Sequence, residues 1–124
     1  MSVIYRDERP SSKSFHEVRV YDEPGSGGGH HHYGVVAGRL GDGYSTELPI
    51  PSFQNGPIQQ VGVNGIHNED LIAILIHRMQ GFQSGEYACR ENALALTKLQ
   101  EAQHWLAHRT QARELRGVEG THAV

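Results

Sequence analysis

The chain has few of the features that tie a protein to a membrane, an oxidising compartment or a nucleic acid. Its single cysteine, Cys89, excludes an intrachain disulfide and suits a reducing compartment. The longest apolar run, residues 71–76, is far too short to span a bilayer, and no secretory signal is visible. A net charge of −3 argues against general binding to DNA, RNA or membrane surfaces. We therefore expect a cytoplasmic protein.

Recognisable catalytic and metal-binding motifs are lacking as well. The glycine-rich residues 25–29 are not followed by the Lys-Ser or Lys-Thr of a P-loop. Residues 30–32 are three consecutive histidines, whose side chains would alternate along a strand, and no Cys or nearby carboxylate completes a recognisable zinc set. Cys89 has no assigned base, and His104 and His108 lack the Glu of the His-Glu-x-x-His motif. We expect no enzyme, no cofactor and no metal.

The first sixty or so residues hold all five prolines and most of the glycines, and they predict short strands joined by turns. Candidate strands cover residues 15–21, 31–39 and 44–50. Asn55-Gly56 is a hairpin signal, which predicts a further strand through Ile58, Val61 and Val63. Residues 1–64 are therefore expected to form a small antiparallel β region.

After Gly65 the periodicity becomes helical. Asn68 is a candidate cap for a helix that should end near Phe82, and a second helix should run from about Cys89 to Arg116. One stripe of the second helix follows a three-then-four spacing: Leu96, Leu99, Gln103, Leu106, Thr110 and Arg113. The fold class is α+β, with residues 65–124 as a helical hairpin. The second helix, of about 28 residues, would be about 40 Å long, so we expect another chain to cover it.

Four side chains stand out as candidates for binding a ligand. Arg109 and Arg113 lie four apart and share a helical face, where their guanidinium groups could bind phosphate. The alternative is a solvated helix end. Phe82 is either a core aromatic or a surface on which a base stacks, and Asn92 is either a late cap or a polar anchor for a base or ribose.

Much of the chain resembles one known family. The resemblance rests on residues 19–25, 31–33, 61–65, 68–71, 81–83, 88–99 and 116–122. These stretches are similar to the phage hairpin family of Thoeris anti-defence proteins, which also includes the anti-CBASS sponge. The sequence departs from that pattern at His67 and at Glu86-Tyr87.

The resemblance implies that the protein binds glyco-cyclic ADP-ribose, the messenger of Thoeris immunity, without cleaving it. It also implies hexamers built as trimers of dimers, and separate pockets that hold cyclic di- or trinucleotides in some members. Phe82, Asn92, Arg109 and Arg113 match positions that line the messenger pocket, and Arg90 and Thr97 match positions of the second type of pocket.

Helix geometry adds a constraint to that site. Asn92 and Arg109 are 17 positions apart, hence about 26 Å along one helix. One cyclic nucleotide can touch both only if a second chain runs antiparallel and crosses near Ala102 and Gln103, which gives two equivalent sites per dimer.

Two other functions stay open on the sequence alone. One is an enzyme that hydrolyses the same messenger, with His104, His108 or Glu91 as acid–base groups. The other is a phage structural protein whose hairpin only mediates assembly.

Overall fold

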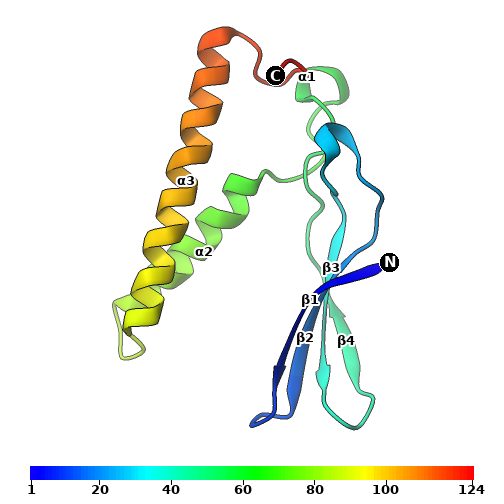
Figure 1. Cartoon of the computed structure of the whole chain (residues 1–124), viewed down its shortest axis with the longest axis vertical. Helices are drawn as coiled ribbons and strands as arrows, with labels where there is room; N and C mark the ends of the chain where they lie inside the picture. Colours follow the sequence, from blue (N-terminus) through cyan, green and yellow to red (C-terminus); the bar gives the residue numbers. More distant parts are fainter. The chain divides into compact units, whose positions relative to one another are not determined.

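The computed structural model describes residues 1–124, and their contacts divide the chain into two compact units (Figure 1). The sheet unit comprises Met1–Gly56 and Val63–Gly65, and the helical unit comprises Pro57–Gly62 and Ile66–Val124. The α+β class expected from the sequence is confirmed. The division into domains at residues 64 and 65 stays a prediction.

The sheet unit is a four-stranded antiparallel meander in which each strand pairs with the next along the chain. Its strands are β1 (Ser2–Arg9), β2 (Ser14–Val20), β3 (Tyr33–Arg39) and β4 (Ser45–Leu48), and a short 3-10 turn, η1 (Ser26–Gly28), lies between β2 and β3. The sequence missed β1, because four consecutive charged residues at positions 6–9 hide its alternation. Those charges and a bulge between Val3 and Tyr5 protect an edge strand from unwanted pairing.

The strand predicted after Asn55-Gly56 is wrong. Residues Ile58–Val61 form a single helical turn, α1, between Pro57 and Gly62. The Asn55 N–H donates to Oδ1 of Asn64 at 2.8 Å, and Nδ2 of Asn64 donates to the Asn55 carbonyl at 2.7 Å. An asparagine side chain thus takes the place of a partner strand at this point, and the turn signal does not produce a hairpin.

A buried ion pair lies beside the small apolar core of the sheet, which is formed by Val20 and Val36. Glu17 is only 7% exposed and lies between Arg6 on β1 and Val36 on β3 in the strand register. Its carboxylate accepts hydrogen bonds from Arg19 Nε and Arg6 Nη1, both at 2.7 Å. The bonds from Arg19 and Arg6 lower the pKa of Glu17.

We expect the Glu17→Gln variant to remove part of the acid sensitivity of the sheet. Because the folded-state pKa is lowered, the stabilisation is present above the unfolded pKa of about 4.5 and is lost as pH falls through the folded value. Amide hydrogen exchange in β2 and β3, corrected for intrinsic rates, should show this loss in the natural protein and much less of it in the variant. Glu8→Gln is the matched control, because Glu8 also binds Arg6 but its side chain is 52% exposed. Parallel acid profiles for the natural protein and Glu17→Gln would contradict the assignment.

The helical unit contains α2 (Asn68–Gln83) and α3 (Arg90–Arg116), and both helices were predicted within about a residue at each end. The cap of α2 is one residue earlier than expected: Asn68 is already helical, and the backbone N–H of His67 donates to Oδ2 of Asp70 at 2.9 Å. Cys89 caps α3 by accepting the Asn92 N–H on Sγ at 3.4 Å. Gly117, with φ of 71°, ends α3 as predicted.

The two helices pack along a strip of side chains that we call the helix seam. The seam consists of Ile72, Ile76, Met79 and Gln83 on α2, and Asn92, Leu96, Leu99, Gln103, Leu106, Thr110 and Arg113 on α3. The stripe predicted on α3 is thereby confirmed as a packing surface that ends in polar residues.

The seam does not give the helical unit an apolar core. No apolar side chain of this unit is buried, and Ile74 and Leu75 on α2 remain 56% and 40% exposed. No helix of the protein combines the length and hydropathy needed to cross a membrane.

Candidate functional site

The helix seam sorts the remaining side chains of the hairpin into two flanks. Each residue turns a helix by about 100°, so residues just before seam positions lie on one side of a helix and residues just after lie on the other. In an antiparallel pair of helices, the residues that precede seam positions lie on the same side of the hairpin in both helices. We call this side the leading flank. The residues that follow seam positions lie on the opposite side, which we call the trailing flank. The leading flank includes Leu71, Leu75, Arg78 and Phe82 on α2, and Ala95, Lys98, Ala102, Trp105 and Arg109 on α3.

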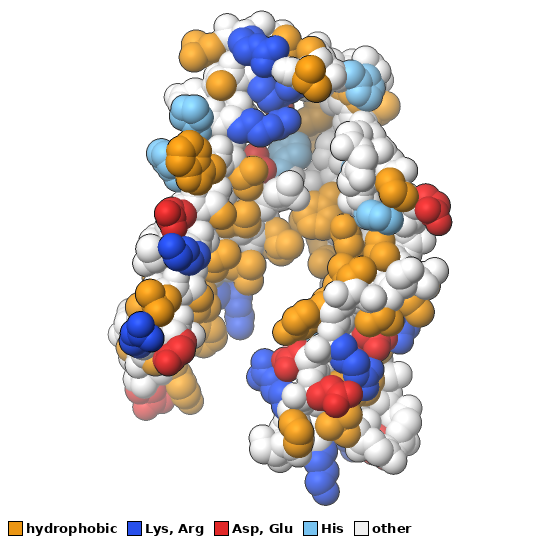
Figure 2. Space-filling view, viewed as in Figure 1, with side chains coloured by type: hydrophobic (Ala, Val, Ile, Leu, Met, Phe, Trp, Pro, Cys, Tyr) orange, Lys and Arg blue, Asp and Glu red, His pale blue; other side chains and the backbone are white.

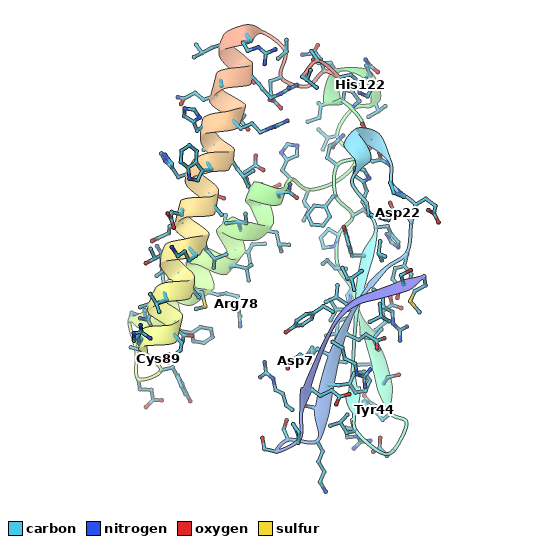
Figure 3. The ribbon with its side chains drawn as sticks, in the orientation of Figure 1. Asp7, Asp22, Tyr44, Arg78, Cys89 and His122 are labelled. Atoms are coloured by element: carbon cyan, nitrogen blue, oxygen red, sulfur yellow. The ribbon has the colours of Figure 1, made fainter.

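Phe82 and Asn92 lie at the turn end of the hairpin, which Cys89 marks in Figure 3. The Phe82 ring is on the leading flank and 39% exposed, and the Arg78 guanidinium lies 5.4 Å from its centre. Asn92 is half-buried, and its Nδ2 donates to the Tyr87 carbonyl at 3.5 Å. That long bond leaves most of the amide's hydrogen-bonding capacity free for a ligand.

Arg109 lies on the leading flank toward the opposite end of α3, where Lys and Arg side chains gather in Figure 2. It is exposed, and its guanidinium forms no hydrogen bond or ion pair within the chain. An unpaired guanidinium on a surface that also carries an exposed aromatic ring suits an anionic ligand with a planar group.

Arg113 is four residues further on, but the structure gives it a different environment. It is the one buried residue of α3. Its Nε donates to Glu119 at 2.9 Å, its Nη1 donates to the Ala123 carbonyl at 2.6 Å, and its Nη2 donates to the carbonyls of Val118 and Thr121 at 2.9 and 3.3 Å. Four of its five N–H donors are thus used within the chain. Arg113 organises residues 117–124, which we call the tail; its predicted contact with a ligand stays a prediction.

Arg90 and Thr97 lie away from the leading flank. Thr97 directly follows the seam residue Leu96, and Arg90 lies seven residues before it, so the two share the trailing side of α3. Arg90 is exposed and unpaired, whereas Thr97 Oγ1 donates to the Ala93 carbonyl at 3.1 Å. Arg90 and Thr97 are therefore on a different side of the hairpin from Phe82 and Arg109, and their assignment to a second pocket stays a prediction.

A shallow groove of about 480 Å³ lies on the trailing side, and it includes two of the candidate acid–base groups. It is lined by Glu69, Gln103, His104, Ala107, His108, Thr110 and Gln111, and Glu91 is not part of it. Nowhere in the chain do three or more His, Cys, Asp or Glu side chains gather as a metal would require.

The sequence that forms the hairpin matches a known protein family. A family model described as Acb2/Tad1, hairpin domain, matches residues 47–111, which is more than half of the chain. The chain belongs to this family, so the family predicted from the sequence is confirmed.

The chain is also similar to a named phage protein. The chain is 56% identical over 79 residues to the protein named Thoeris anti-defense 1 of Bacillus phage SBSphiJ7. The matched region covers 64% of this chain and 56% of that protein, so the chain spans little more than half the length of its relative.

Removing the carboxylate that binds Arg113 should loosen the tail without unfolding α3. We expect Glu119→Ala to cost the tail about 1 kcal/mol, because one charge-assisted hydrogen bond to a partly exposed carboxylate is lost. Amide exchange at Val118 and Thr121 should therefore become about fivefold faster. Glu114→Ala is the control, since Glu114 is exposed and unpaired near the same helix end. Unchanged exchange in Glu119→Ala would show that the backbone contacts alone hold the tail.

Proposed function

We propose that this protein is a phage anti-defence protein that binds glyco-cyclic ADP-ribose in the cytoplasm of the infected host without cleaving it. Holding the messenger away from its effector would block Thoeris immunity. The observation that carries the proposal is the unpaired guanidinium of Arg109 on the same flank as the exposed ring of Phe82. Membership of the hairpin family and the name of the phage relative support it.

The messenger site is shared between two chains in this proposal. Phe82 and Asn92 lie at one end of the hairpin and Arg109 lies toward the other, about 26 Å from Asn92 along α3. An antiparallel dimer that crosses near Ala102 brings each end of one chain to the opposite end of its partner. The small side chains of Ala95 and Ala102 on the leading flank allow a second helix to approach closely.

The exposed apolar side chains of the hairpin supply the driving force for assembly. Ile74, Leu75 and Leu94 are 40–56% exposed in the single chain, and burying them would supply the apolar core that the hairpin lacks. Three such dimers would form the hexamer that the family resemblance implies.

The two arginines have different roles in this site. Arg109 binds the pyrophosphate directly, because its donors are free. Arg113 is a positioning residue that fixes the tail beside the pocket, because its donors are already used. Arg90 and Thr97, on the trailing side, form part of a second pocket that binds cyclic di- or trinucleotides of CBASS immunity.

Bound messenger should be recovered intact. The protein is loaded with glyco-cyclic ADP-ribose, freed of excess, and denatured by heat, and the released compound is identified by chromatography and mass. We expect the unchanged cyclic molecule at about one equivalent per chain, because none of the candidate acid–base groups, His104, His108 and Glu91, is hydrogen-bonded to a nucleophilic side chain. Time-dependent appearance of a linear product, lost in the His104→Ala variant, would favour the hydrolase instead.

Complementation between two defective chains should test the shared site. Asn92→Ala and Arg109→Ala chains should each bind no messenger alone, because every site of either homodimer lacks one group. Mixed, unfolded mildly and refolded, they should regain about a quarter of natural capacity, since half of the dimers are mixed and each mixed dimer holds one intact site. The regained sites should have natural affinity in calorimetry.

Two controls accompany that experiment. Exchange of subunits is verified with differently tagged chains, and an Asn92→Ala preparation refolded alone should stay inactive. Verified exchange without any regained binding would place Asn92 and Arg109 in separate pockets. Arg109→Ala is used without a change at Arg113, so that the tail stays folded.

A further inference from the structure

The outer surface of α3 carries an aromatic side chain that the proposed site does not yet use. Trp105 is the single tryptophan of the chain and is 64% exposed. The rings of His104 and His108 lie close to it, with centres at 5.5 and 5.9 Å and planes inclined by 72° and 76°. Such edge contacts favour the observed orientation of the indole, while much of its surface stays in contact with water.

The position of Trp105 relates it to the proposed messenger site. Trp105 lies on the leading flank, four residues before Arg109, so the two side chains are neighbours on one helical face. Lys98, one further heptad toward the turn, is paired with Glu101 at 3.2 Å, whereas Arg109 is unpaired. A large π-surface one turn away from a free guanidinium matches a ligand that joins a base to phosphate groups.

We propose that Trp105 is a base-stacking residue of the messenger site, binding the adenine while Arg109 binds the pyrophosphate. This inference rests on the proposed function and adds a residue that determines recognition of the base. In the antiparallel dimer, Arg109 lies between Trp105 and the partner subunit's Phe82. The site then has one aromatic surface on each side of its phosphate-binding group.

The proposed dimer brings the partner helix to the leading flank at Ala102, and the nucleotide occupies the part of this flank beyond the crossing, over Trp105 and Arg109. Contact with protein alone would leave the guanidinium of Arg109 buried without a countercharge, and an unpaired buried charge is costly. An anionic ligand supplies the missing countercharge together with the ring that covers the indole.

Because Trp105 is the single tryptophan, its fluorescence reports on this site alone. Titration of the natural protein with glyco-cyclic ADP-ribose should quench the emission, with a midpoint equal to the dissociation constant from calorimetry. Inorganic pyrophosphate, which offers Arg109 a phosphate but offers Trp105 no base, should leave the emission unchanged. Excitation at the red edge of the indole band avoids absorption by adenine.

Substitution measures the contribution of the indole to affinity. Loss of one stacked base should cost about 1–3 kcal/mol, so Trp105→Ala should weaken messenger binding about 5- to 150-fold. Trp105→Phe should retain most of the affinity, because an aromatic face remains. The matched control is Leu115→Ala, which removes an 87% exposed apolar side chain near the C-terminal end of α3 and should bind normally. Circular dichroism and gel filtration should show the same fold and assembly for all variants.

The outcomes separate this inference from the proposed function. If calorimetry detects messenger binding while Trp105 emission stays constant and Trp105→Ala binds normally, Trp105 is not in the site and the proposed function stands. If the emission instead shifts to shorter wavelength with protein concentration and without ligand, a second copy covers the indole and the inference is wrong. If the natural protein binds no messenger in calorimetry, both fail. Should Trp105→Ala alter the assembly, the titration of the natural protein decides.

Discussion

The packing of α2 against α3 along the helix seam is the constraint on which the rest of the hairpin depends. Once Ile72, Ile76 and Met79 face Leu96 and Leu99, the 100° turn per residue decides which flank each other side chain occupies. Phe82, Trp105 and Arg109 then share one flank, and Thr97 and the shallow groove lie on the other. A slip of one residue in this seam would disperse the leading flank, so the packing of modest apolar side chains determines the arrangement of the proposed binding groups.

The same seam would couple binding to assembly in the proposed dimer. Two helices that bury no apolar side chain between them have little stability of their own, and the longer helix extends well beyond what the shorter one can cover. In the proposed dimer, the surface that completes the apolar core also completes the pocket. A weakened interface would therefore reduce messenger binding even where every contact residue is intact.

The sequence predicted those elements whose signals are local and strong. For α3, capping at Cys89 sets the start and the positive φ of Gly117 sets the end. Helical spacing predicts the seam stripe, and all three features are present in the structure. The signals failed where side chains replaced the backbone as partners: Asn64 binds the backbone of Asn55, and the predicted hairpin becomes the turn of α1. The burial of Arg113 could not be predicted either. Three of its four acceptors are backbone carbonyls of the tail. Every residue has a backbone carbonyl, so the amino-acid sequence does not indicate which ones bind the guanidinium.

Because Arg113 binds mostly to backbone carbonyls, the amino-acid sequence of the tail can vary. Because Val118, Thr121 and Ala123 bind Arg113 through carbonyl oxygens, their side chains can change freely as long as the chain follows the same path. Thr121 is a partial exception, since its hydroxyl also donates to the Val118 carbonyl. Glu119 is the tail residue whose side chain binds the guanidinium. Most of the surface that the tail presents can therefore change in sequence without disturbing the end of α3.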